Sequence, residues 1–429
     1  MVEKHIINNG LTVLTKEIHH TPVVSHWIWY RVGSRNEIPG NTGISHWVEH
    51  MQFKGTKKYP LNVLDAEISK VGGMWNAMTH LDWTTYYETL PAEKIGIAID
   101  LEADRMKNSV FDPAETELER TVIISEREGN ENEPLFRLSE SLRRKAFTQH
   151  PYSHEVIGEL SDLRSMTRDD LYSHYQKFYT PANAVIAVAG DFSTNELIKR
   201  IQEAYSSIPS GKLETTLIEP ENQIGHAERV AVEGPGDTLF LELAYRSPAA
   251  ADDDFIPLMV LDSLLTGPAS LSMVGGGSIS NKTSRLYQRL IETDLAMSIS
   301  GSLQTTIDPY LYSILIIANP DQDTEQIISA IDKEINELVQ NSVNDAEISR
   351  AKKQARALFA YGSESITNQA FWMGYSSMFS DYSWFDNYLA NISRVNRDQI
   401  HAAAKKYLTP DHRVIGIYKP TGTNNNHDR

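Results

Sequence analysis

Residues 43–53 carry their apolar and polar side chains with the period of an α-helix. The apolar positions recur at i, i+3, i+4 and i+7 and form one stripe: Ile44, Trp47, Val48 and Met51. His46, Glu49 and His50 gather on another side of the same helix. The pattern predicts a helix that packs on a core through one face and displays polar side chains on a second.

The rest of the chain alternates between strand-like and helix-like segments. Stretches rich in β-branched and aromatic residues predict strands at residues 11–15, 23–32, 76–90 and 185–190, with two strands in the third stretch. Helical periodicity predicts helices at residues 61–71, 95–108, 115–128, 134–147 and 168–175. Asn41 or Thr42 is the expected cap of the helix at 43–53. This mixture of elements predicts an α+β fold.

A helix–turn–strand segment occurs twice in the chain. Arg168-Asp-Asp-Leu and Arg397-Asp-Gln-Ile open the two copies, and each continues through a Thr-Pro turn into a Val-Ile strand. One offset of 229 residues relates the matched positions without a gap. We interpret the match as an internal duplication, with a chance likeness of two such segments as the alternative. The halves are then expected at residues 1–208 and 228–418, with a linker at 209–227 and a disordered tail at 419–429.

Composition narrows the class of protein. The formal net charge of −17 argues against a nucleic acid partner and fits basic or neutral polypeptides, although an acidic surface also serves solubility. The sequence contains no cysteine, so a metal site would have to use His and carboxylate ligands. No apolar run approaches the length of a transmembrane helix, and the N-terminus resembles a strand rather than a signal or transit peptide. We therefore expect a cytoplasmic protein.

The polar side of the helix at 43–53 has the chemistry of a metal site. His46 and His50 are one turn apart and can bind one ion. The carboxylate of Glu49 lies on the same side and can take a proton from a metal-bound water. A hydrolytic zinc site needs a third protein ligand and one open position. The alternative is a solvated polar face that binds no metal.

The third ligand must come from another element, and the helix at 115–128 is the obvious source. Glu119 and Glu126 are two turns apart and share a face, and Glu115 lies near that face. Glu128 is rotated away from Glu126 by about 200°. Spacing therefore narrows the choice but leaves it open, and Glu clusters of this kind are also common on solvated helix faces.

Several short motifs occur in an order that resembles the pitrilysin family of inverted-motif zinc peptidases. They are Gly33–Glu37, the His-x-x-Glu-His motif within Gly43–Thr56, Gly72–Ala77, Asp82–Tyr87, Asp104–Met106, Glu119–Glu126 and His150–Gly158. A weaker match extends to Ser284–Leu290 in the second half. The family includes insulin-degrading enzyme and the mitochondrial processing peptidase. The resemblance covers most of the first half, and the His-x-x-Glu-His motif does not recur in the second.

The resemblance assigns a role to each residue of the candidate metal site. It implies that His46, His50 and Glu126 bind Zn²⁺, and that Glu119 accepts a hydrogen bond from a ligand histidine. Glu49 would be the general base, which takes a proton from the zinc-bound water and later gives it to the leaving amine. The implied reaction is hydrolysis of a peptide bond without a covalent intermediate.

The family also implies an architecture and a way of binding substrate. Two duplicated α+β halves, each an antiparallel-rich sheet covered by helices, would face each other as a clamshell around a chamber. Asn76 and Ala77 match an edge strand that pairs with the backbone of an extended peptide, whereas an ordinary internal strand is the alternative. The expected substrates are short or unfolded polypeptides.

The second half departs from the family pattern at two positions. Many active members carry an Arg and a Tyr that help to hold the substrate carbonyl, but this chain has Ile291 and Met297 where they are expected. Neither side chain can donate a hydrogen bond to a developing oxyanion. We therefore expect a related partner subunit to supply the Arg and Tyr in a heterodimer, with a homodimer as the other arrangement. A structural or assembly subunit that retains the metal site and hydrolyses little is the alternative function.

Overall fold

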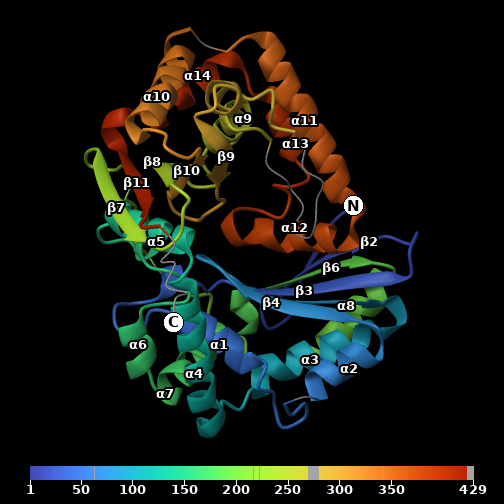
Figure 1. Cartoon of the computed structure of the whole chain (residues 1–429). Helices are drawn as coiled ribbons and strands as arrows, with labels where there is room; N and C mark the ends of the chain where they lie inside the picture. The colour runs from blue at the N-terminus through green and yellow to red at the C-terminus, as the bar shows by residue number, and fades with distance from the viewer. Residues whose placement is uncertain (62, 216, 222, 269–279, 342, 423–429) are drawn as a thin grey trace. The chain divides into compact units, whose positions relative to one another are not determined.

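The computed structural model describes the chain except residues 62, 216, 222, 269–279, 342 and 423–429 (Figure 1). It divides into two compact units, which we call unit 1 and unit 2. Unit 1 contains residues 1–127, 154–218 and 363–385, and unit 2 contains residues 128–153, 219–362 and 386–429. The last seven residues of the expected disordered tail lie outside the described residues.

Unit 1 is built on a six-stranded mixed sheet. Its strands are β1 (Glu3–Ile6), β2 (Thr12–Glu17), β3 (Val23–Tyr30), β4 (Met74–Thr79), β5 (Thr84–Pro91) and β6 (Ala184–Gly190). They pair in the order β1-β2-β6-β3-β5-β4, in which β2–β6 is parallel and the other pairs are antiparallel. The strands that the sequence predicts in this region are confirmed, and β4 forms one edge of the sheet.

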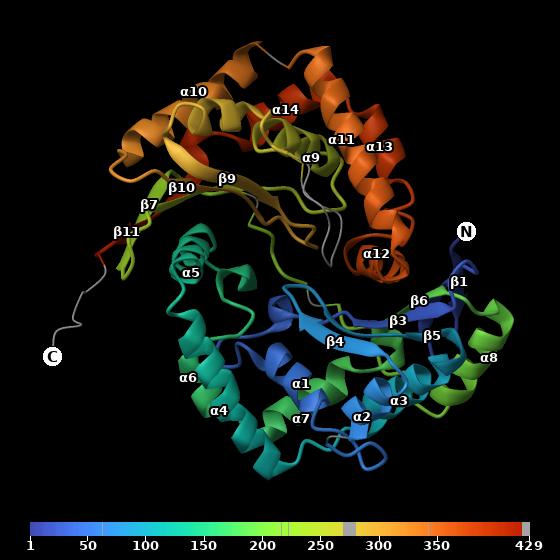
Figure 2. The same cartoon turned by 45° about the vertical axis from the view of Figure 1, so that its right-hand side comes forward.

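Helices cover both faces of this sheet (Figure 2). On one face α12 (Ile366–Phe379) packs against β3 and β6. On the other, α1 (Ile44–Gln52) packs against β4 and β5, and α3 (Ile95–Asn108) packs against β3 and β5. The other helices of unit 1 are α2 (Val63–Lys70), α4 (Pro113–Asn130), α6 (Leu160–Ser165), α7 (Arg168–Phe178) and α8 (Thr194–Tyr205). Of α4, the part up to Arg127 belongs to unit 1. Because both faces are covered, β3 is buried along almost its whole length, including the polar residues Ser25 and His26.

Unit 2 is built on a five-stranded mixed sheet. Its strands are β7 (Glu228–Gly234), β8 (Phe240–Arg246), β9 (Ala296–Leu303), β10 (Leu311–Ala318) and β11 (Arg413–Pro420). They pair in the order β7-β11-β8-β10-β9, in which β7–β11 is parallel and the other pairs are antiparallel. Its helices are α5 (Pro134–Ala146), α9 (Phe255–Leu265), α10 (Thr324–Asn341), α11 (Asp345–Glu364), α13 (Tyr388–Arg394) and α14 (Arg397–Tyr407). Among them, α5 packs against β7, β8 and β11.

The two sheets share one topology. The order β2-β6-β3-β5-β4 in unit 1 corresponds, strand for strand, to β7-β11-β8-β10-β9 in unit 2, and the single parallel pair falls in the same place. Capping boxes begin α7 at Thr167 and α14 at Asn396, which are separated by the repeat offset of the sequence. The predicted α+β fold with two duplicated, antiparallel-rich halves is therefore confirmed.

Each sheet also takes one helix from the opposite part of the sequence. α12, from residues 366–379, belongs to unit 1, and α5, from residues 134–146, belongs to unit 2. The division of the chain into residues 1–208 and 228–418, and the clamshell arrangement, stay predictions. Within the described part of the chain, no helix is both long enough and apolar enough to cross a membrane.

Candidate metal centre

The helix that carries the His-x-x-Glu-His motif begins at a glycine. Gly43 is the residue that caps α1, and it has a φ of +87°, where a Cβ atom would lie 2.4 Å from the carbonyl oxygen of Ile157. Only glycine adopts this conformation there without strain. The expected cap by Asn41 or Thr42 is wrong, because the Thr42 hydroxyl donates to Asp162 (2.8 Å) instead of to the helix.

A buried carboxylate takes the place of the expected cap. Glu37 accepts hydrogen bonds from the backbone N–H groups of Gly43 (2.8 Å) and Ser45 (2.9 Å), so it satisfies free donors at the start of α1. Burial raises the pKa of Glu37 to about 8, although these two hydrogen bonds act in the opposite direction. The sequence contains Glu37 in a family-like motif, but local spacing gave no sign that it caps α1.

The apolar stripe of α1 lies in the core of unit 1, as predicted. Trp47, Val48 and Met51 are completely buried, and Ile44 is 4% exposed. The side chains on the other face of the helix are less deeply buried: His46 and His50 are 14% and 23% exposed. Burial of the stripe fixes the rotation of the helix, and the histidines therefore point to one defined place.

Three side chains meet at that place. His46, His50 and Glu126 each offer a ligand atom, and these atoms all lie within 4.8 Å of one another. The Nε2 atoms of His46 and His50 lie 4.0 Å and 3.8 Å from the two carboxylate oxygens of Glu126. A tetrahedral site with bonds of about 2.0–2.1 Å places its ligand atoms about 3.3 Å apart. The three groups therefore need only small shifts to bind one ion.

The second nitrogen of His50 has a partner of its own. Its Nδ1 atom lies 2.7 Å from Oε1 of Glu119, and the other oxygen of Glu119 forms an ion pair with Lys54. Although burial raises the pKa of Glu119, its hydrogen bonds with His50 and Lys54 lower it below the ordinary value. Ionised Glu119 keeps the His50 proton on Nδ1, which leaves Nε2 free to bind a metal.

The two histidines differ in their affinity for a proton. Burial lowers the pKa of His46 to about 3, and the charge on His50 adds to this effect. Burial also lowers the pKa of His50, but the hydrogen bond to Glu119 and the charges of Glu49, Glu119 and Glu126 raise it above the ordinary value. His46 is therefore neutral at pH 7, as a metal ligand must be, whereas the acidic surroundings of His50 raise its affinity for a proton, so a metal ion must displace the Nε2 proton wherever His50 is protonated.

Glu49 is buried beside the ligand cluster. Its side chain lies on α1 between the two histidines and accepts a hydrogen bond from the hydroxyl of Thr79 on β4 (2.5 Å). Burial raises the pKa of Glu49, while Thr79 and the charge of His50 lower it. A carboxylate with a raised pKa that lies next to a metal-bound water is suited to accept a proton from it.

Helix α4 presents Glu119 and Glu126 to α1, and the side chain of Arg120 on α4 contacts α1. The guanidinium of Arg120 lies 4.7 Å from the ring centroid of Trp47 on α1 and donates to the carbonyl oxygen of Met166 (2.8 Å). Glu115 lies one turn before Glu119 on the same side of α4, 3.9 Å from Lys54, and this position along the helix leaves it outside the cluster. Tertiary packing thus distinguishes among the Glu residues that spacing alone left open.

Asn76 and Ala77 lie on β4, the edge strand next to α1. β4 pairs with β5 only in the described sheet, so its outer backbone edge has no partner strand there. Asn76 is exposed and its side-chain oxygen accepts a hydrogen bond from the Ala77 amide (2.9 Å), while Ala77 is 7% exposed. The alternative of an ordinary internal strand is therefore wrong for these two residues.

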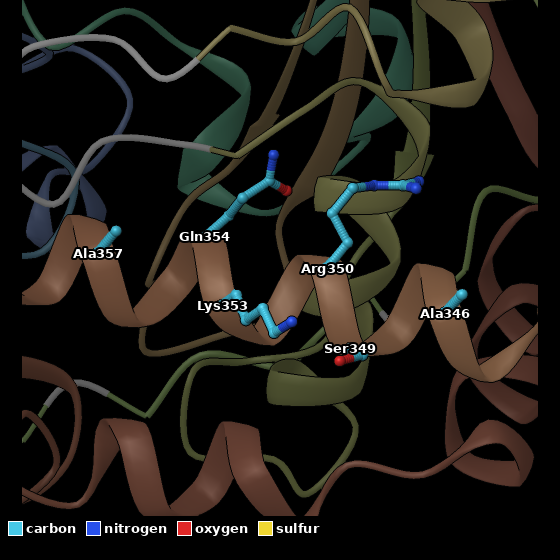
Figure 3. Close-up of a pocket in the computed structure, with 6 residues that line it drawn as sticks. All are labelled: Ala346, Ser349, Arg350, Lys353, Gln354 and Ala357. Atoms are coloured by element: carbon cyan, nitrogen blue, oxygen red, sulfur yellow. The ribbon is translucent and has the colours of Figure 1, made fainter.

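Among the described residues of unit 2, no group of His, Asp and Glu side chains is placed to share a metal ion. A pocket of about 440 Å³ lies along α11, and Figure 3 shows that Arg350 and Gln354 point to the same side of that helix. The pocket is lined by Ala346, Ser349, Arg350, Lys353, Gln354 and Ala357, none of which is a His, Asp or Glu.

The two positions where the sequence departs from the family pattern lie in different elements of unit 2. Ile291 ends a helical turn (Tyr287–Ile291), and Met297 lies on β9 and is 53% exposed.

Comparisons with known proteins agree with the motifs. The family model "Insulinase (Peptidase family M16)" matches residues 12–159, and the model "Peptidase M16 inactive domain" matches residues 165–355. The chain is 25% identical to an uncharacterized zinc protease, YmxG, of Bacillus subtilis, over 98% of this chain and 99% of that protein. It is 28% identical to a probable mitochondrial-processing peptidase subunit beta of Arabidopsis thaliana, over 81% of this chain and 65% of the relative.

Solved structures share the same fold. A protease from Helicobacter pylori superimposes with a TM-score of 0.89 at 24% identity, covering 98% of this chain and 99% of that chain. A peptidase M16 inactive domain from Pseudomonas fluorescens superimposes with a TM-score of 0.87 at 18% identity, covering 99% of this chain and 98% of that chain. The family that the sequence motifs predict is confirmed, and the chain belongs to peptidase family M16, the insulinase or pitrilysin family.

Proposed function

We propose that this protein is a zinc-dependent endopeptidase. The observation that carries the proposal is the convergence of His46, His50 and Glu126, whose ligand atoms lie within 4.8 Å of one another. Two imidazoles and a carboxylate are the ligand set of a zinc site that keeps a fourth position open for water. The likeness to the zinc protease YmxG of Bacillus subtilis and to zinc protease PqqE of Helicobacter pylori supports zinc as the metal.

In the proposed mechanism Glu49 moves the proton. His46, His50 and Glu126 would hold Zn²⁺, which would lower the pKa of a bound water to near 7 and polarise the scissile carbonyl. Glu49 takes the proton of the attacking water and transfers it to the amine that leaves. Glu119 keeps His50 in the tautomer that binds metal, because its Oε1 atom lies 2.7 Å from Nδ1 and accepts the hydrogen bond from that nitrogen. No side chain forms a covalent bond with the substrate.

The substrate would bind as an added strand on β4. An extended peptide can pair with the free edge through main-chain hydrogen bonds, beginning at Asn76 and Ala77, whatever its own side chains are. Thr79, at the end of the same strand, contacts Glu49, so this pairing would place a peptide beside the general base. Short or unfolded polypeptides can adopt the required extended form, and these are the proposed substrates.

We propose that full activity requires a related partner subunit. Ile291 and Met297 cannot donate a hydrogen bond to a developing oxyanion, and one lost donor reduces the rate by about 10²–10³. The likeness to a mitochondrial-processing peptidase subunit beta, whose name describes one subunit of an enzyme, supports a heterodimer. The match of residues 165–355 to an inactive domain fits a second half without ligands of its own. A homodimer is the other arrangement.

One experiment separates this proposal from the alternative of a structural subunit. Zinc content and cleavage of an unstructured fluorogenic peptide are measured for wild type and Glu49→Gln, with and without a candidate partner chain. We expect one zinc in both proteins and turnover in wild type only. A wild-type protein that binds zinc but cleaves no peptide, even with the partner, would favour the structural role. Unchanged turnover in Glu49→Gln would remove Glu49 from the mechanism.

A further inference from the structure

A row of side chains crosses the sheet of unit 1 on the face that α1 and α3 cover. Trp75 on β4 is the register partner of Glu88 on β5, and Glu88 is the register partner of His26 on β3. Side chains in register point to the same face of a sheet and contact one another. The Nδ1 atom of His26 lies 3.0 Å from Glu88, and both side chains are completely buried.

Arg105 of α3 lies over this row. Its guanidinium forms an ion pair with Glu102, one turn earlier on α3, and lies 3.6 Å from Glu88. The side chain of Arg105 is 2% exposed, and those of both glutamates are not exposed at all. Burial raises the pKa of each glutamate, and an arginine cannot lose its proton in a protein. The guanidinium is therefore a fixed positive charge that the two carboxyl groups hold in place.

Three aromatic rings surround this fixed charge. The guanidinium carbon of Arg105 lies 4.4 Å from the ring centroid of Tyr86, 5.7 Å from that of Phe53 and 5.8 Å from that of Trp75. Phe53 and Trp75 also contact each other, with centroids 4.8 Å apart. A guanidinium within about 6 Å of an aromatic face is attracted to it, more strongly when water is excluded. Arg105 therefore holds three rings from three elements around one point.

Two of these rings are close in the sequence to residues of the proposed active site. Phe53 directly follows α1, three residues after His50, and Trp75 directly precedes Asn76 on the edge strand. Side-chain attachments hold β4 near both ends: Trp75 contacts the Arg105 cluster and donates to Asp65 of α2 (2.9 Å), and Thr79 donates to Glu49. Ala77 lies between them on the same face. An edge strand has backbone hydrogen bonds on one side only, so such side-chain attachments decide how rigidly it is held.

We propose that Arg105 is a positioning residue, which holds β4 against α1 so that its free edge is ready to pair with an extended peptide. This inference rests on the proposed function, because it assumes that β4 binds substrate. Arg105 itself touches neither the metal ligands nor the substrate. Its effect passes through Trp75 and Phe53, and its loss should change peptide affinity and the mobility of β4 while leaving zinc bound.

The test uses the zinc-loaded full chain with Glu49→Gln, which can bind peptide without cleaving it. Arg105→Lys keeps the buried charge and removes the planar group that stacks on the rings. Trp75→Leu removes the aromatic ring of β4 that contacts Arg105. It leaves Arg105 paired with Glu88 and Glu102. Arg246→Lys is the matched control, because Arg246 is also a buried arginine over a ring, 4.0 Å from the centroid of Phe147, but in unit 2. Each variant is checked for folding by circular dichroism and for zinc content.

Two measurements are then made on each variant. Hydrogen exchange of the amides of residues 74–79 reports on β4, and fluorescence anisotropy of a labelled unstructured peptide gives its Kd. We expect Arg105→Lys and Trp75→Leu each to speed exchange in β4 and to raise Kd by about tenfold. The double variant should show less than the sum of the two single effects, because the contact between Arg105 and Trp75 is already lost in each single variant. Arg246→Lys should change neither quantity.

Unchanged exchange in β4 of Arg105→Lys would overturn the proposal, and so would fully additive effects in the double variant. Faster exchange with an unchanged Kd would show that Arg105 holds the strand but does not prepare it for a peptide, and would also overturn it. If the parent protein binds zinc but no peptide at all, substrate binding at β4 is wrong. The exchange rates would then still decide whether Arg105 holds the strand.

Discussion

The Nδ1 atom of His50 lies 2.7 Å from Oε1 of Glu119, and this contact joins the two helices that form the candidate metal centre. His50 lies on α1, whereas Glu119 lies two turns before Glu126 on α4. A single hydrogen bond therefore orients one histidine and links the two helices. Lys54 pairs with the other oxygen of Glu119 and keeps that carboxylate ionised.

Replacement of Glu119 should weaken zinc binding without abolishing it. Glu119→Gln removes the negative charge that holds the Nδ1 proton of His50, and loss of such a partner typically weakens metal binding about 10- to 100-fold. The zinc Kd is measured by competition with a chromophoric chelator. Glu196→Gln, a change at an exposed position of α8, should leave the Kd unchanged. An unaltered Kd in Glu119→Gln would show that the contact has no role in binding metal.

Replacement of Glu126 should have a larger effect than replacement of Glu128. Glu126→Gln removes an anionic ligand, so we expect zinc to be lost on dialysis and peptide hydrolysis to fall by at least about 10³. Glu128→Gln is the matched control, because this residue is two positions further along α4 and outside the cluster. Metal analysis by mass spectrometry and a peptide assay give the two readouts. Equal zinc content in the two variants would remove Glu126 from the ligand set.

Thr79 should set the acidic limit of activity. Its hydroxyl donates to Glu49 and lowers the pKa of that carboxyl group. Glu49 must be ionised to accept a proton, so Thr79→Val should move the acidic limb of the profile of kcat/KM against pH to higher pH. Thr85→Val is an isosteric control, since the Thr85 hydroxyl donates to the carbonyl of Ile28 instead. A profile that moves equally in both variants would exclude a specific effect of Thr79.

Acid should destabilise the fold through His174. This side chain of α7 lies 3.3 Å from the hydroxyl of Ser45, and burial lowers its pKa to about 3. The unfolded chain binds a proton at His174 below about pH 6.5, but the folded protein does not until about pH 3. The stability that neutral His174 provides is therefore present above pH 6.5 and is lost as the pH falls through this range.

The contribution of His174 to the pH dependence of stability is obtained by comparing wild type with His174→Gln. Between pH 6 and pH 4, the free energy of unfolding of wild type should fall faster than that of His174→Gln, by at most about 1.4 kcal/mol per pH unit. Urea denaturation in the presence of a chelator gives both values without a contribution from zinc release. Parallel pH dependence in the two proteins would mean that His174 is not a neutral buried group in the folded state.

The sequence by itself determined the features that depend on neighbouring residues. His46, Glu49 and His50 lie within five residues of one helix, so the helical period alone places them on one side, and the apolar stripe decides which side faces the core. The repeat at an offset of 229 residues predicted two related halves for the same reason, since each copy carries its own caps, turn and strand. Such patterns can be read from the sequence because they depend on residues that are close together in the chain.

Only the tertiary structure decided features that depend on how distant segments pack. Spacing left Glu115, Glu119 and Glu126 as candidates, and the packing of α4 on α1 places Glu126 with the two histidines, Glu119 at Nδ1 of His50 and Glu115 near Lys54. Glu37 replaced the expected cap, because a carboxylate six residues before Gly43 folds back onto the helix start. The exchange of α5 and α12 between the units is likewise absent from any local pattern. An amphipathic helix needs an apolar surface, but its sequence does not say which sheet provides it.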